Sequence, residues 1–88
     1  MARFEILDGT VGTMGATAQA DILFELGLMH ATGRDCEVDL VAAHKWFNIA
    51  AIKGSERAAG LRAELAISMS KADIAKALRA AREWMTIH

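Results

Sequence analysis

Hydrophobic residues recur at spacings of three and four along most of the chain, and this period predicts helices. The first expected helix, over 18–32, has one apolar face made by Ile22, Leu26 and Met29, and a second made by Phe24 and Leu28. A helix that is apolar around most of its circumference is normally packed between other helices. We therefore expect this helix to be covered on more than one side.

Three further helices follow, over about 39–53, 56–68 and from 70 to the end of the sequence. The expected buried side of the second contains Leu40, Ala43, Phe47, Ala50 and Ala51, with Trp46 beside it, and leaves His44, Lys45 and Asn48 to solvent. The expected buried side of the third contains Ala58, Leu61, Leu65 and Met69. The expected buried side of the fourth contains Ile74, Ala77, Leu78, Ala81, Trp84 and Met85.

Residues at the predicted helix ends support these boundaries. Asp39, Ser55 and Ser70 are good N-caps, because their side-chain oxygens can accept a hydrogen bond from a free N–H of the first turn. Gly33 and Gly54 are suited to ending the first and second helices, because glycine adopts the left-handed conformation that commonly follows a helix. Four helices without strands predict an all-α fold.

The segment before the first expected helix carries glycine at positions 9, 12 and 15. We expect residues 1–17 to form either a flexible arm or a short anchor in which Phe4, Ile6 and Leu7 lie on a neighbouring surface. Residues 18–88 would form the folded domain.

The second and fourth helices align without a gap when one is shifted onto the other, which places Leu40, Ala43 and Trp46 on Leu78, Ala81 and Trp84. The period that this alignment gives is typical of an α-solenoid built from helical hairpins. Residues 18–54 would be one full unit, and residues 55–88 a compressed second unit.

The residues of the full unit also carry a resemblance. The patterns Leu26-Gly-x-Met-His-x-x-Gly33 and Ala43-x-x-Trp46-Phe-x-x-Ala50-Ala51-x-x-Gly54 resemble the Sel1-like repeat, a relative of the tetratricopeptide repeat. Residues 69–84 resemble the closing half-unit of small bacterial members of that family. The resemblance implies a right-handed α-solenoid that acts as an adaptor in protein complexes, usually without enzymatic activity. The chain departs from the family where His30 stands in place of tyrosine and where Asp35 and Cys36 stand in place of glycine and valine.

Composition narrows the expected function. The chain has 88 residues, enough for one small domain, yet 53% of them are hydrophobic. A domain of this size cannot bury so much apolar surface by itself, so we expect it to self-associate or to bind a protein partner. The side chains predicted to form that surface are Phe4, Phe24, Leu28, His30 and Trp84.

Charge and cysteine content bear on nucleic-acid binding, membrane association and cellular location. The net charge of -1 provides no overall field for nucleic acid or an anionic membrane. No apolar run approaches the roughly 20 residues that span a bilayer, and the N-terminus does not read as a secretory signal. Cys36 is the single cysteine, which fits a reducing compartment and predicts a cytoplasmic protein.

The sequence gives little support for a catalytic site or a metal site. His30 and His44 belong to different expected helices with no further ligand at helical spacing, and nothing supplies Cys36 with a base or oxyanion donors. We therefore predict no catalytic residue, no metal and no cofactor. Two alternatives stay open: a small nucleic-acid-binding regulator that uses the basic fourth helix, and a redox or metal sensor that uses Cys36.

Overall fold

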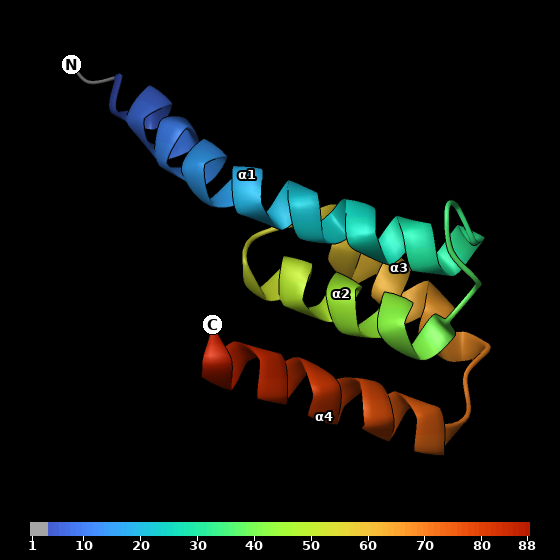
Figure 1. Cartoon of the computed structure of the whole chain (residues 1–88). Helices are drawn as coiled ribbons and strands as arrows, with labels where there is room; N and C mark the ends of the chain where they lie inside the picture. The colour runs from blue at the N-terminus through green and yellow to red at the C-terminus, as the bar shows by residue number, and fades with distance from the viewer. Residues whose placement is uncertain (1–3) are drawn as a thin grey trace.

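The computed structural model describes the backbone of residues 4–88 and the side chains of residues 18–88. This part of the chain forms four helices, α1 (Phe4–Thr32), α2 (Leu40–Ile52), α3 (Glu56–Ile67) and α4 (Lys71–Ile87). Helix α2 lies at the centre, and α1, α3 and α4 each pack against it (Figure 1). The predicted all-α fold is confirmed, with α4 packed on α2 rather than on α3.

The predicted helix ends are also confirmed. The side chain of Asp39 accepts a hydrogen bond from the N–H three residues on at 3.0 Å, and the hydroxyls of Ser55 and Ser70 do the same at 3.1 Å. Gly33 and Gly54 follow α1 and α2 with φ angles of +79° and +118°. These caps fix where α2, α3 and α4 begin, and therefore how the hairpins turn.

Helix α1 begins earlier than predicted. It starts at Phe4 rather than near Ala18, and its N-terminal part extends past the other helices (Figure 1). The three glycines each weaken a helix by about 1 kcal/mol relative to alanine, but they keep the backbone N–H that proline would remove. The three glycines therefore lie within the helix, whereas the sequence pattern predicted that they precede it.

The core lies mainly between α1 and α2. It contains Leu23 and Phe24 from α1, Phe47 and Ile49 from α2, and alanines from all four helices. Ile22, expected on a buried face, is 65% exposed because α2 covers the opposite side of α1. Helix α2 packs against α1, and Arg57 of α3 reaches Phe24, but no described helix covers the side of α1 that carries Ile22.

Two further positions differ from the predicted pattern. His44 was expected to face solvent, but its exposed fraction is 4%. Helix α3 covers this side of α2, where Arg62 donates a hydrogen bond to the Asn48 side chain at 2.6 Å. Leu78 was expected to be buried, but it is 41% exposed, at the edge of the contact between α2 and α4.

Candidate functional site

The residues predicted to form a binding surface lie in different environments. Phe24 is 3% exposed and its ring centroid lies 5.7 Å from that of Phe47, so it is a core residue and not a free surface residue. The guanidinium of Arg57 lies 4.5 Å from the Phe24 ring centroid and covers it further. This corrects the prediction for Phe24. Phe4 lies outside the residues whose side chains are described.

The other three predicted residues lie in three separate places. Leu28 is half-buried and lines a shallow apolar hollow of about 300 Å³ between α1 and α3. The Nδ1 atom of His30 lies 2.9 Å from the carbonyl oxygen of Leu26, within the last turns of α1. Trp84 contacts Trp46 edge to face, with ring centroids 5.7 Å apart. The structure therefore does not bring Leu28, His30 and Trp84 together.

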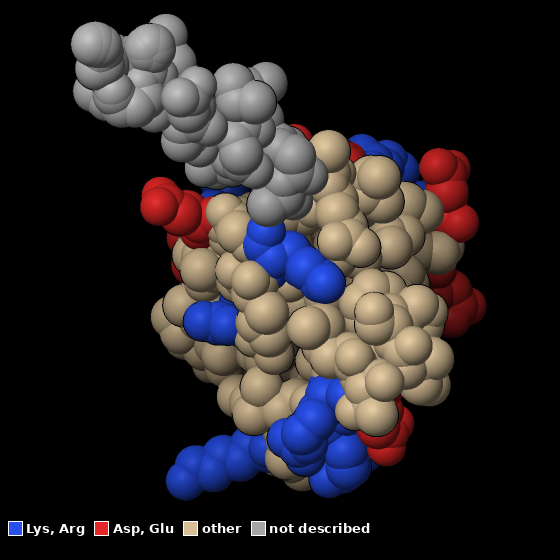
Figure 2. Space-filling model, turned by 90° about the vertical axis from the view of Figure 1, so that its left-hand side faces the viewer, with Lys and Arg blue, Asp and Glu red and all other residues tan. Residues whose placement is uncertain are grey.

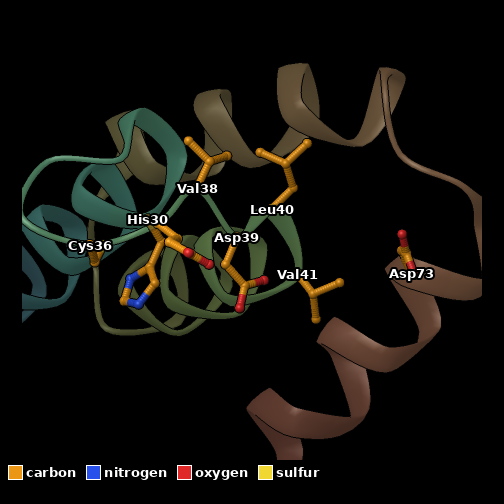
Figure 3. Close-up of a pocket in the computed structure, with 8 residues that line it drawn as sticks. His30, Cys36, Val38, Asp39, Leu40, Val41 and Asp73 are labelled. Carbon is orange, nitrogen blue, oxygen red and sulfur yellow. The ribbon is translucent and has the colours of Figure 1, made fainter.

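A second hollow lies beside the loop that joins α1 to α2. Its volume is about 550 Å³, and Asp73 faces it from α4, across from His30 and Asp39 (Figure 3). The thiol of Cys36 donates to the carbonyl of Met29 at 3.5 Å. Cys36 and His30 are thus each paired with the backbone of α1. The remaining lining residues are Glu37, Val38, Leu40 and Val41.

A mainly apolar opening lies between α2 and α4, and we call it the α2–α4 groove. Its volume is about 390 Å³, and it is lined by Asn48, Ile52, Leu78, Ala81, Arg82 and Met85. Ile52 is 59% exposed, and Leu78, which belongs to the apolar side of α4, is 41% exposed. Because such exposure costs free energy in water, this groove is the best candidate for a binding surface.

The border of the α2–α4 groove is basic. Helical spacing places Lys71, Arg79 and Arg82 along the flank of α4 next to Leu78, and all three are exposed. Arg62 of α3 reaches Asn48 in the groove. Figure 2 shows one end of the molecule, where Lys and Arg side chains stand on and below a broad uncharged area and most acidic residues lie toward its edges. The groove therefore suits an apolar ligand surface with acidic neighbours.

His44 is the buried polar side chain of α2. Its Nδ1 atom has no hydrogen-bond partner among the described residues. Burial lowers the pKa of His44 below 6.5, and the positive charge of Arg62 lowers it further. The imidazole is thus neutral at neutral pH.

No family model, curated protein or solved structure matches the chain. Among the described residues, no three His, Cys, Asp or Glu side chains gather where they could hold a metal ion. No helix in the described part of the chain is long and apolar enough to cross a membrane.

Ile52, Arg82 and Met85 line the groove, and sequence reasoning did not single them out as a surface. Ile52 is in the last turn of α2, and the helical pattern did not place it on the predicted buried side of that helix. One available signal was charge. Residues 53–88 contain seven Lys or Arg against four acids, although the whole chain has a net charge of -1. That asymmetry points to a basic surface on the second half of the chain.

Proposed function

We propose that this protein is a non-enzymatic adaptor, or a subunit of a larger protein assembly, built as a small Sel1-like helical unit. Its mode of action is the burial of exposed apolar side chains against a partner protein. The basic border of the groove selects partners that present acidic residues beside their apolar contacts. The resemblance to bacterial Sel1-like repeats and the lone Cys36 support a bacterial, cytoplasmic protein.

The observation that carries this proposal is the α2–α4 groove. Ile52 and Leu78 are large apolar side chains that remain exposed on adjacent packed helices. Burying such a side chain is worth about 1.5–3 kcal/mol relative to leaving it in water. A partner that covers both residues would therefore gain free energy at the centre of a contact, where binding energy is usually concentrated.

The basic flank of α4 also raises nucleic acid as a ligand, but the groove itself disfavours it. Phosphate binding is driven by release of counterions from many cation contacts, and the flank offers Lys71, Arg79 and Arg82. The floor between them is apolar side chain rather than a basic track. We therefore favour a protein partner.

The test compares proteins retained from extracts of the source cells by three immobilised forms of the full chain. These are the wild type, the groove variant Ile52→Asp with Leu78→Asp, and the control Ile67→Asp. Ile67 is 86% exposed on α3, and it does not line the groove. Circular dichroism first establishes that all three are folded.

We expect wild type and Ile67→Asp to retain the same proteins, and the groove variant to lose at least one of them. Mass spectrometry with isotope labelling measures the ratios. Equal retention by all three forms would contradict a role for the groove. Loss of retention after nuclease treatment would instead favour the nucleic-acid alternative.

A further inference from the structure

The described chain is electrically divided into an acidic part and a basic part. Residues 18–39 contain five acids against one arginine, whereas residues 53–88 contain seven Lys or Arg against four acids. Helix α3 is neutral, with two arginines and two glutamates, so the acidic part is α1 with the loop after it and the basic part is Lys53 with α4. These helices lie on different sides of α2 (Figure 1).

The outward side of α1 combines these acids with uncovered apolar side chains. Asp21, Ile22 and Glu25 are exposed, and Met29 is half-buried two turns beyond Ile22. Ile22 is 65% exposed, so its apolar surface is in water. Helical spacing puts Ile22, Glu25 and Met29 on one stripe, with Asp21 beside it. We call these four residues the α1 face.

The α1 face and the α2–α4 groove match in spacing and in charge. Leu78 and Met85 stand in the groove at the same sequence spacing as Ile22 and Met29 on the α1 face. Each pair spans two helical turns, about 10 Å along the axis. Acids flank the apolar pair on α1, whereas Arg79 and Arg82 flank the apolar pair on α4.

We propose that the α2–α4 groove of one copy binds the α1 face of a second copy. This rests on the proposed function, because it names the partner of the same groove. The contact buries Ile22 and Met29 against Leu78 and Met85. It also brings Asp21 and Glu25 toward Arg79 and Arg82.

The arrangement of the two surfaces determines the kind of assembly. Helix α2 does not cover Ile22 of the α1 face, and α1 and α4 lie on different sides of α2 (Figure 1), so a single copy does not fill its own groove. A contact between unlike surfaces repeats from copy to copy and forms either a ring or an open chain. A two-turn contact is small, so the assembly forms and dissociates with protein concentration.

The test uses sedimentation velocity on the full chain over a wide concentration range, with charge-reversal variants. The face variant is Asp21→Lys with Glu25→Lys, and the groove variant is Arg79→Glu with Arg82→Glu. The control is Lys76→Glu, which changes an exposed charge on the side of α4 away from Leu78. All substitutions are at exposed positions, and circular dichroism verifies helix content.

We expect wild type and Lys76→Glu to assemble beyond the 9.5 kDa chain as concentration rises, and to assemble less as salt is raised. Each reversal variant alone should fall to the mass of a single chain. An equimolar mixture of the two variants should assemble again, because one retains a native groove and the other a native α1 face.

Three outcomes would overturn the proposal. One is a wild type that stays at the mass of one chain at every concentration. Another is a mixture that fails to restore assembly, which would indicate like surfaces in contact. The third is assembly that requires added nucleic acid. The first two leave the proposed function in place if the groove variant Ile52→Asp with Leu78→Asp still loses a protein retained from extract by the wild type.

Discussion

The backbone of Gly27, in the C-terminal part of α1, lies directly against the ring of Phe47 from α2. A Cβ atom built on Gly27 would lie 3.1 Å from Cγ of Phe47 and closer still to two other ring atoms. Phe47 is 2% exposed, so its ring is part of the core. The group that approaches Gly27 is therefore an aromatic side chain of the next helix.

This contact predicts that Gly27→Ala is destabilising although alanine favours helix. The added methyl forces the Phe47 ring to shift, and such overpacking costs about 1–3 kcal/mol. Gly60→Ala is the matched control, because no described atom lies within 4 Å of a Cβ built there. It should raise the free energy of unfolding by up to about 1 kcal/mol. Urea unfolding followed by circular dichroism measures both, and a stabilising Gly27→Ala would contradict the packing.

The difference between these glycines shows which part of the fold the sequence could predict. The caps at Asp39, Ser55 and Ser70 were predictable because each bond joins groups three residues apart. The environment of Gly27 depends on Phe47, which belongs to the next helix along the chain. No local pattern states which side of α1 will meet α2, and for the same reason Ile22 was expected to be buried.

His44 gives a prediction about pH. Its pKa is lowered in the folded protein by burial and then by the charge of Arg62. In the unfolded chain the pKa of His44 is 6.5, so on acidification the unfolded chain binds a proton before the folded protein does. This contribution to stability is complete above pH 6.5 and is lost as pH falls from there toward the lower pKa of the folded state. Urea unfolding at a series of pH values from neutral to mildly acidic measures the loss.

The variant His44→Leu isolates that contribution, since it removes the titrating group and the unpartnered Nδ1 atom together. As pH falls below neutral, we expect the free energy of unfolding of wild type to decrease more than that of His44→Leu. His30 and His88 are present in both proteins, so the comparison isolates the change at His44. A difference that stays constant over the whole pH range would show that His44 titrates alike in the folded and unfolded states.

The candidate groove was less predictable than the fold. Ile52 and Met85 are distant in the sequence, and only the packing of α4 on α2 makes them neighbours. Periodicity assigned Leu78 to a buried side, but it could not show that the contact with α2 ends at that residue. The charge asymmetry could be read in the sequence, whereas its position beside an apolar groove required the structure.

Substitutions at Asp35 and Gly33 test the backbone conformation of the loop between α1 and α2. Its φ angle is +63°, a left-handed conformation that costs a residue with a Cβ about 1–2 kcal/mol. Asp35→Gly removes this strain but gives the unfolded chain more freedom, so we expect a net gain below about 1 kcal/mol. Gly33→Ala should lower stability, because its φ is +79° and a Cβ there would lie 3.0 Å from Val38 Cγ2. Thermal unfolding compares them, and equal shifts would contradict this account.

The Trp46–Trp84 contact joins α2 to α4 and thereby holds one wall of the groove. The rings meet at an interplanar angle of 82°, an edge-to-face geometry that adds about 0.5–1.5 kcal/mol beyond buried area. A double-mutant cycle with Trp46→Ala, Trp84→Ala and both together should return a coupling energy of that size. Circular dichroism must follow the urea unfolding, because the substitutions remove the fluorescent side chains. Additive losses would show that α4 is held on α2 by its other contacts, including the buried Ala77 and Ala81.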